Sequence, residues 1–192
     1  MVALPQSSRM TASDYLAWES QQELRHEYIA GEVVAMTGGT VPHNDLAVNL
    51  LLILGSQVRA QGCRINIADV KVPIPSTGDY FYPDLVVSCD ERDRTAIKLI
   101  QFPKLIVEVL SPGTEAKDRG MKFKQYCTLP SLQEYVLIDY ETISVDCYRR
   151  GEGRMWLYSS YGVGDVVTLA SVNCEVTIAQ IYENVQVPPE SS

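Results

Sequence analysis

The run Leu105–Leu110, Leu-Ile-Val-Glu-Val-Leu, limits what this chain can fold into more than any other segment. Its nearly continuous apolar character is typical of a central strand that is covered on both faces. Because side chains alternate along a strand, Glu108 shares one face with Ile106 and Leu110. An unpaired buried carboxylate costs several kcal/mol. We therefore expect a metal ion, a lysine or a solvent-exposed position at the end of the strand to offset the charge of Glu108. The alternative is a Glu108 without a functional role that points to solvent from a half-exposed strand.

A second acid, Asp84, lies in the β-prone run Tyr-Pro-Asp-Leu-Val-Val at residues 82–87. Pro83 cannot donate a hydrogen bond to a neighbouring strand, so Asp84 marks the place where this strand begins or bends. An Asp after Pro is also common in turns. Two acids on neighbouring short strands nevertheless suit one hard divalent cation whose remaining ligands are waters.

Two lysines follow on a predicted helix over residues 114–128, which also carries Asp118 and Tyr126. Asp118, Lys122 and Tyr126 are four residues apart and form one stripe. Lys124 projects about 200° around the helix from Lys122, so only one of the two lysines can face the acids. The spacing does not choose between them, and a solvated lysine is the ordinary alternative for each.

The remaining pattern mixes helices and strands. We predict a short helix capped by Thr11 and a hairpin over residues 26–36 around Ala30-Gly31. Residues 45–60 give the best helix pattern in the chain, with Gly62 where a C-terminal stop belongs. This helix is apolar nearly all round, so we expect it to pack against a sheet. Other predicted strands are at residues 65–74, 104–110, 136–138, 143–148, 155–158 and 166–169, with a turn at 76–79. The order indicates an α/β or α+β fold.

The size of the chain indicates one domain, because 192 residues and 21.4 kDa match a typical domain. We expect a core over residues 10–185 and a frayed polar tail at 185–192. The longest aliphatic run, residues 50–54, is far shorter than the ~20 residues of a spanning helix. With no apolar signal segment in the first ten residues, we expect no membrane association and a cytoplasmic protein.

The five cysteines form no C-x-x-C pair. An odd, scattered count argues against a disulfide framework and against a thiolate metal site. We therefore predict five free thiols in a reduced compartment.

A net charge of −8 argues against a nucleic-acid partner. The charge is nevertheless segregated, since residues 92–124 carry eight basic and four acidic side chains. A solvated charged surface would give the same pattern. This basic stretch surrounds Glu108, where it could meet backbone phosphates.

Together the motifs resemble the Uma-type putative restriction endonuclease family of the PD-(D/E)XK nuclease superfamily. The resemblance covers roughly residues 10–185, and its motifs are Glu27-Tyr28-x-x-Gly31-Glu32, Asp69-Val70-Lys71-Val72, Tyr82-Pro83-Asp84-Leu85-Val86-Val87, Val107-Glu108-Val109-Leu110-Ser111-Pro112, Asp118-Arg119-x-x-Lys122-x-x-x-Tyr126 and Leu129-Pro130-Ser131-Leu132-Gln133-Glu134-Tyr135. It implies a restriction-endonuclease-like mixed central sheet flanked by helices, here with additional C-terminal strands.

The resemblance also implies a site. Carried over by position, Asp84 and Glu108 would bind Mg²⁺ or Mn²⁺. The third position of the superfamily's E-x-K pattern is Leu110 here, so the strand lacks the expected lysine. Members of this family resemble one another in placing that lysine on the next helix, which points to Lys122. Glu27 would be a further catalytic acid.

Other residues take supporting parts in the expected function. Asp69 is a candidate for a supporting role, and the candidates for contact with DNA are Lys117, Arg119 and Lys124. The resemblance further suggests a homodimer, which would let two sites address both strands. The resulting hypothesis is a metal-dependent endonuclease acting on DNA. The alternative is a catalytically weak or inactive nuclease-fold module that binds DNA or another protein, which the low isoelectric point and the missing strand lysine favour.

Overall fold

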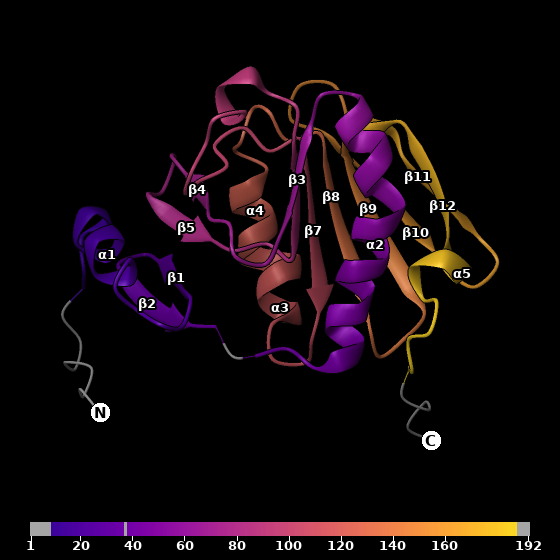
Figure 1. The fold of residues 1–192 in the computed structure, drawn as a ribbon, viewed down its shortest axis with the longest axis horizontal. Coiled ribbons are helices and arrows are strands. Elements are labelled where there is room, and N and C mark those ends of the chain that lie inside the picture. The colour runs from indigo at the N-terminus through magenta and orange to yellow at the C-terminus, as the bar shows by residue number, and fades with distance from the viewer. Residues whose placement is uncertain (1–8, 37, 188–192) are drawn as a thin grey trace.

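The computed structural model describes residues 9–36 and 38–187 (Figure 1). Its helices are α1 Ala12–Glu19, α2 Val41–Ala60, α3 Glu115–Lys117, α4 Phe123–Tyr126 and α5 Ile178–Ile181. Its strands are β1 His26–Ile29, β2 Glu32–Ala35, β3 Arg64–Ile67, β4 Val72–Ile74, β5 Asp79–Phe81, β6 Leu85–Ser88, β7 Leu105–Leu110, β8 Glu134–Asp139, β9 Ser144–Arg150, β10 Trp156–Tyr161, β11 Val166–Leu169 and β12 Cys174–Thr177. A π-helical turn, Asp118–Lys122, joins α3 to α4.

The main sheet has six strands in the order β10-β9-β8-β7-β6-β3. Strands β7 and β8 are parallel, whereas every other neighbouring pair in this sheet is antiparallel, so the predicted mixed sheet is confirmed. Every residue of β7 is buried, as expected for a central strand. A parallel neighbour requires a crossover connection. Here the crossover contains α3, the π-helical turn and α4.

The two faces of β7 belong to two separate apolar clusters. Leu105, Val107 and Val109 pack in one cluster with α2, β11, β12 and α5. Ile106 and Leu110 pack in the other, together with residues of β4, β5 and α4. The predicted alternation is therefore confirmed, and Glu108 lies on the second face. In Figure 1, α2 crosses in front of the main sheet.

Helix α2 begins four residues before its predicted start because Thr40 caps it and a proline occupies its first turn. Its buried residues Leu46, Leu50, Leu54 and Val58 follow one face and pack on the sheet. Gly62, at φ +76, takes the left-handed conformation expected after a helix end.

A second sheet, in the order β2-β1-β5-β4, was only partly predicted. The predicted hairpin is confirmed as β1 and β2, with Ala30 and Gly31 both at positive φ. The single strand predicted at residues 65–74 is wrong, because a bend with Ala68 at φ 54 separates β3 from β4. The turn predicted at 76–79 ends earlier, and Asp79 begins β5, which pairs with β4 and β1.

The prediction of five free thiols is wrong for two of them. Cys63 and Cys89 form a disulfide whose Cα atoms are 4.1 Å apart. Arg64 pairs with Ser88 across β3 and β6, so the two cysteines continue this antiparallel pair by one step. Opposite residues at such a position have their Cβ atoms close enough together for the two sulfur atoms to bond. A separation of 26 residues hid this pairing, which depends on the register of the sheet.

Two further expectations concern the ends of the chain and the membrane. Val185 and Val187 pack against the larger apolar cluster, while residues 188–192 of the predicted frayed tail lie outside the described part. The first eight residues, where a signal segment was not expected, also lie outside it. Over residues 9–36 and 38–187, no helix has both the length and the apolar character needed to cross a bilayer.

Candidate active site

The two predicted acids lie side by side at one end of the main sheet. Leu85 pairs with Val107 across β6 and β7, so the next residues along, Asp84 and Glu108, are opposite each other. The side chain of Glu108 is 4% exposed and that of Asp84 is 20% exposed. Glu108 is therefore not the half-exposed residue of the structural alternative, and its charge must be compensated inside the protein.

Lysine and tyrosine side chains from the crossover compensate Glu108. Lys122 Nζ lies 3.0 Å from Glu108 Oε1, and the hydroxyl of Tyr126 donates to the same oxygen at 3.0 Å. Lys122 and Tyr126 both belong to the predicted stripe, which the π-helical turn and α4 hold against β7.

The structure decides between the two candidate lysines. Lys122 is buried, and its Nζ is also 3.0 Å from Glu27 Oε1 and 3.1 Å from Asp118 Oδ1. Lys124 is exposed on the other side of the helix. The ammonium near the acids is therefore that of Lys122.

Glu27 reaches this cluster from a different sheet. It lies on β1, it is 5% exposed, and its Oε2 is 3.3 Å from the ammonium of Lys117. The pairing of β1 with β5 holds this strand beside the main domain core, because Phe81 of β5 packs against Tyr126. Residues more than 80 positions apart thus meet at one buried point.

Four carboxylates and two lysines make up the cluster: Glu27, Asp84, Glu108, Asp118, Lys117 and Lys122. Burial raises the pKa of Glu108 well above its usual value, and the charge of Lys122 only partly opposes this. Burial also raises the pKa of Asp84. Burial opposes the charge on Lys122, but Glu108, Glu27 and Asp118 outweigh it and raise the pKa of that lysine well above its usual value. The cluster thus contains two more acidic than basic side chains.

Other predicted residues lie apart from the cluster or are held by acids. Asp69 is exposed and pairs with Arg25 at 3.2 Å. The guanidinium of Arg119 bonds to Glu115 at 2.7 Å and to Asp146 at 2.6 Å. In the basic stretch, Arg92 and Arg94 also pair with neighbouring acids, so much of its charge is compensated within the protein.

Sequence reasoning missed His43 and gave no role to Asp118. His43, in the first turn of α2, places Nε2 3.0 Å from the carbonyl oxygen of Val109 and 3.5 Å from Asp84 Oδ2. Asp118 was already on the lysine stripe, and its spacing of four from Lys122 was a usable signal. No local pattern pointed to His43, because 66 residues separate it from Val109.

The free carboxylate oxygens decide whether a divalent ion fits. Asp84 Oδ2 accepts the backbone N–H of Val109 at 2.7 Å, and Glu108 Oε1 is used by Lys122 and Tyr126. Within the described ranges, Asp84 Oδ1 and Glu108 Oε2 have no hydrogen-bond or ion-pair partner, and no group of three or more His, Cys, Asp or Glu side chains is arranged to hold a metal ion. Two free oxygens suit a hard divalent ion that keeps most of its waters.

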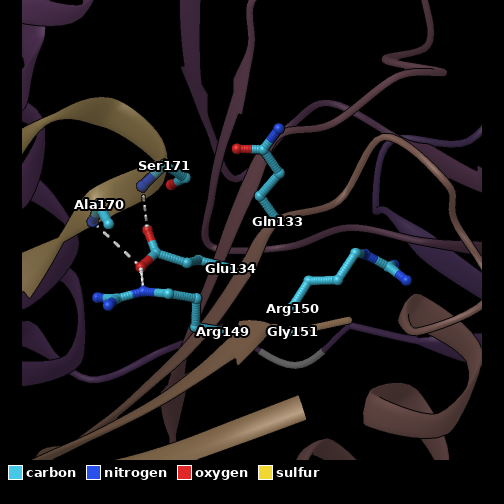
Figure 2. A pocket seen from close by; sticks show the side chains of 7 residues that line it. All are labelled: Gln133, Glu134, Arg149, Arg150, Gly151, Ala170 and Ser171. Carbon is cyan, nitrogen blue, oxygen red and sulfur yellow. Dashed lines mark hydrogen bonds and ion pairs between the residues drawn. The ribbon is translucent and has the colours of Figure 1, made fainter. Parts of the chain in front are cut away.

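A cavity of about 320 Å³ lies at the opposite end of β8 and is unrelated to this cluster (Figure 2). Glu134, fully buried at the start of β8, accepts bonds there from Arg149 Nε and from the backbone N–H groups of Ala170 and Ser171. Both oxygens of this carboxylate thus accept hydrogen bonds, which connect β8 to β9 and to the turn at residues 170–172 before β12. The buried Glu134 carboxylate in this cavity therefore stabilises the fold.

Comparison with known proteins identifies the family of this chain. A family model described as "Uma2: Putative restriction endonuclease" matches residues 12–180. The chain belongs to this family. The predicted resemblance is therefore confirmed, and membership of the Uma2 family supports a nuclease.

Relatives with similar sequences occur in Synechocystis sp. The protein slr1290 is 37% identical over 174 residues, which cover 91% of this chain and 92% of slr1290. The protein sll1609 is 34% identical over 159 residues, or 82% of this chain and 90% of sll1609. A crystal structure from Anabaena variabilis, titled as a putative nuclease belonging to DUF820, matches with a TM-score of 0.75. It is 17% identical and the match covers 90% of this chain and 97% of that one, so it confirms the nuclease-like fold.

Proposed function

We propose that this Uma2 family member is a divalent-metal-dependent endonuclease that hydrolyses phosphodiester bonds of DNA. In this proposal Asp84 and Glu108 hold Mg²⁺ or Mn²⁺ through Asp84 Oδ1 and Glu108 Oε2. Lys122 supplies a fixed positive charge beside them, and Glu27 is a further acid of the site.

One observation carries the proposal. Asp84 and Glu108 are opposite each other on neighbouring strands, and the ammonium of Lys122 is 3.0 Å from Glu108. This arrangement lowers the stability of the folded protein, because it concentrates buried carboxylates that repel one another. Buried, charge-coupled acids of this kind are typical of functional sites.

Each side chain has a definite part in hydrolysis. A bound divalent ion would lower the pKa of a coordinated water and offset the charge of the phosphate. Lys122 adds a point charge that stabilises the charge developing on the phosphate and orients the attacking water. Glu27 and Asp118 hold the ammonium of Lys122 in place, and Tyr126 fixes the orientation of Glu108 by its 3.0 Å hydrogen bond.

The proposal includes partners. DNA would contact the protein through Lys124, whose ammonium is exposed, and through Lys117 and Arg119 at the edge of the cluster. We propose a homodimer, in which two sites cut both strands. We also propose a cytoplasmic location, although the Cys63–Cys89 disulfide is unusual for that compartment. Light scattering that gives only the 21.4 kDa of one chain at micromolar concentration would contradict the dimer.

A second candidate is a nuclease-fold module that binds DNA or protein without cutting. The observation that favours it is the internal compensation of the basic stretch, where Arg92, Arg94 and Arg119 all pair with acids of the chain itself. It predicts that the acid cluster binds no catalytic ion.

Isothermal titration with Mn²⁺ separates the two candidates. The nuclease predicts saturable binding and nicking of supercoiled plasmid that EDTA abolishes, and Asp84→Asn should remove both. The matched control is Asp69→Asn, because Asp69 is exposed and outside the cluster. Absence of Mn²⁺ binding and of nicking in the parent protein would favour the non-catalytic module.

A further inference from the structure

The end of β7 has an unusual backbone environment at Val109. In a strand, the N–H and C=O of one residue face the same neighbouring strand. Continuing the pairing of Leu85 with Val107 by two residues places Pro83 opposite Val109, just beyond the start of β6. Proline has no backbone N–H, so this neighbour cannot donate to the Val109 carbonyl.

Two side chains occupy the missing ladder positions. The Val109 N–H donates to Asp84 Oδ2 at 2.7 Å, and His43 Nε2 lies 3.0 Å from the Val109 carbonyl oxygen. Because a carbonyl oxygen only accepts, Nε2 must carry the proton in this bond. The same Nε2 is 3.5 Å from Asp84 Oδ2. His43 and Asp84 are thus in contact with each other and are also linked through the backbone N–H and C=O of one residue, Val109.

Rigid surroundings fix the imidazole of His43. The Thr40 hydroxyl accepts the backbone N–H of His43 at 3.4 Å, which caps α2, and the body of α2 is anchored in the core. The ring packs against Gly39, where an added Cβ would lie 3.1 Å from His43 Nδ1. The His43 side chain is only 19% exposed. A group held this firmly can fix the orientation of its neighbour.

We propose that His43 is a positioning residue: its Nε2–H donates to the Val109 carbonyl oxygen, and its ring, with Nε2 3.5 Å from Asp84 Oδ2, keeps that carboxylate oriented so that Oδ1 stays directed to the divalent cation. The inference rests on the proposed function and deepens it. Among the described residues, Asp84 has one anchoring bond besides its contact with His43, from Val109 N–H, so without the imidazole the carboxylate can rotate and the Val109 carbonyl loses its donor. The positive end of the α2 dipole lies at the same place and favours a carboxylate there.

Three substitutions separate donation from bulk. His43→Gln keeps an N–H at the reach of Nε2, His43→Asn shortens that reach, and His43→Leu keeps volume without a donor. For each variant we would measure the Mn²⁺ dissociation constant by titration. In EDTA we would measure hydrogen exchange at the Val109 amide, which reports its bond to Asp84 without any metal. Melting curves in EDTA identify variants that do not fold.

The proposal expects His43→Leu to weaken Mn²⁺ binding at least tenfold and to speed exchange at Val109, with His43→Gln within threefold of the parent. If His43→Leu does not fold, the comparison of His43→Gln with His43→Asn gives the same test. Equal Mn²⁺ affinity and equal exchange in His43→Leu and the parent would overturn the positioning role and leave the nuclease proposal intact. A parent that binds no Mn²⁺ but shows the expected exchange pattern would support the positioning of Asp84 and overturn the metal proposal instead.

Discussion

The ammonium of Lys122 lies 3.0 Å from Glu108 Oε1, although the two residues are 14 positions apart and belong to a helical crossover and a central strand. A strand lysine two residues after Glu108 would point to the same face, but Leu110 occupies that position and is buried. The crossover supplies the positive charge in its place. The site is therefore assembled by tertiary packing, and its parts can be tested separately.

The lysine is tested by Lys122→Ala. We expect plasmid cleavage to fall at least tenfold, or about 1.4 kcal/mol of barrier, because the fixed charge beside Glu108 is lost. Lys124→Ala should change cleavage less than threefold, since its exposed ammonium lies away from the acids and would supply only one of several contacts with DNA. Equal losses in the two variants would indicate general phosphate binding.

The acid is tested by the pH dependence of apo stability. The pKa of Glu108 in the folded protein lies above its ordinary value of 4.5, so its contribution to stability is complete below pH 4.5 and is lost as the pH rises through the raised value. The apo protein should thus melt at a lower temperature at pH 8 than at pH 5.5. Melting curves in EDTA measure this, and Glu108→Gln should reduce the slope and stabilise the apo protein at pH 8.

Added Mg²⁺ or Mn²⁺ should act in the opposite direction. An ion bound only by the folded protein raises the melting temperature. This rise should grow with pH, because protons compete with the ion for the carboxylate of Glu108. Glu108→Gln should abolish the rise, whereas the exposed Glu175→Gln should keep it. If the ion stabilises the parent and Glu108→Gln equally, the metal site lies elsewhere.

Glu27 is tested by Glu27→Gln, which distinguishes a positioning acid from a metal ligand. Its oxygens lie 3.0 Å from Lys122 and 3.3 Å from Lys117. We therefore expect cleavage to fall about tenfold while the Mn²⁺ dissociation constant changes less than threefold. A loss of Mn²⁺ binding as large as that of Asp84→Asn would make Glu27 a ligand.

The disulfide is tested by counting thiols. In denaturant without reductant, three cysteines should react, namely Cys127, Cys147 and Cys174, and five should react after reduction. Because the bond closes a loop of 26 residues, Cys63→Ser with Cys89→Ser should lower the free energy of unfolding by about 3 kcal/mol. Five reactive thiols before reduction, in protein taken directly from cells, would mean that the pair stays reduced there.

Local sequence patterns predicted the main strands well, because alternation and apolar runs reflect burial directly. They identified β7 and the two faces on either side of Glu108. They failed where long-range pairing decides the structure. The bend at Ala68, the pairing of Cys63 with Cys89 and the approach of His43 to Val109 all depend on sheet register. The choice of Lys122 over Lys124 required the packing of the crossover on β7.

In the proposed nuclease the positive charge of the site comes from the crossover, so the site would be less stable than the sheet that carries it. The crossover helices α3 and α4 are short, and a π-helical turn interrupts them. If this segment opens locally, Lys122 leaves three carboxylates to repel one another while the six strands remain paired. Partial opening of that kind needs less free energy than global unfolding. On heating, catalysis should therefore disappear several degrees before the β-sheet signal in circular dichroism, and a preparation that looks fully native by that signal can already be inert.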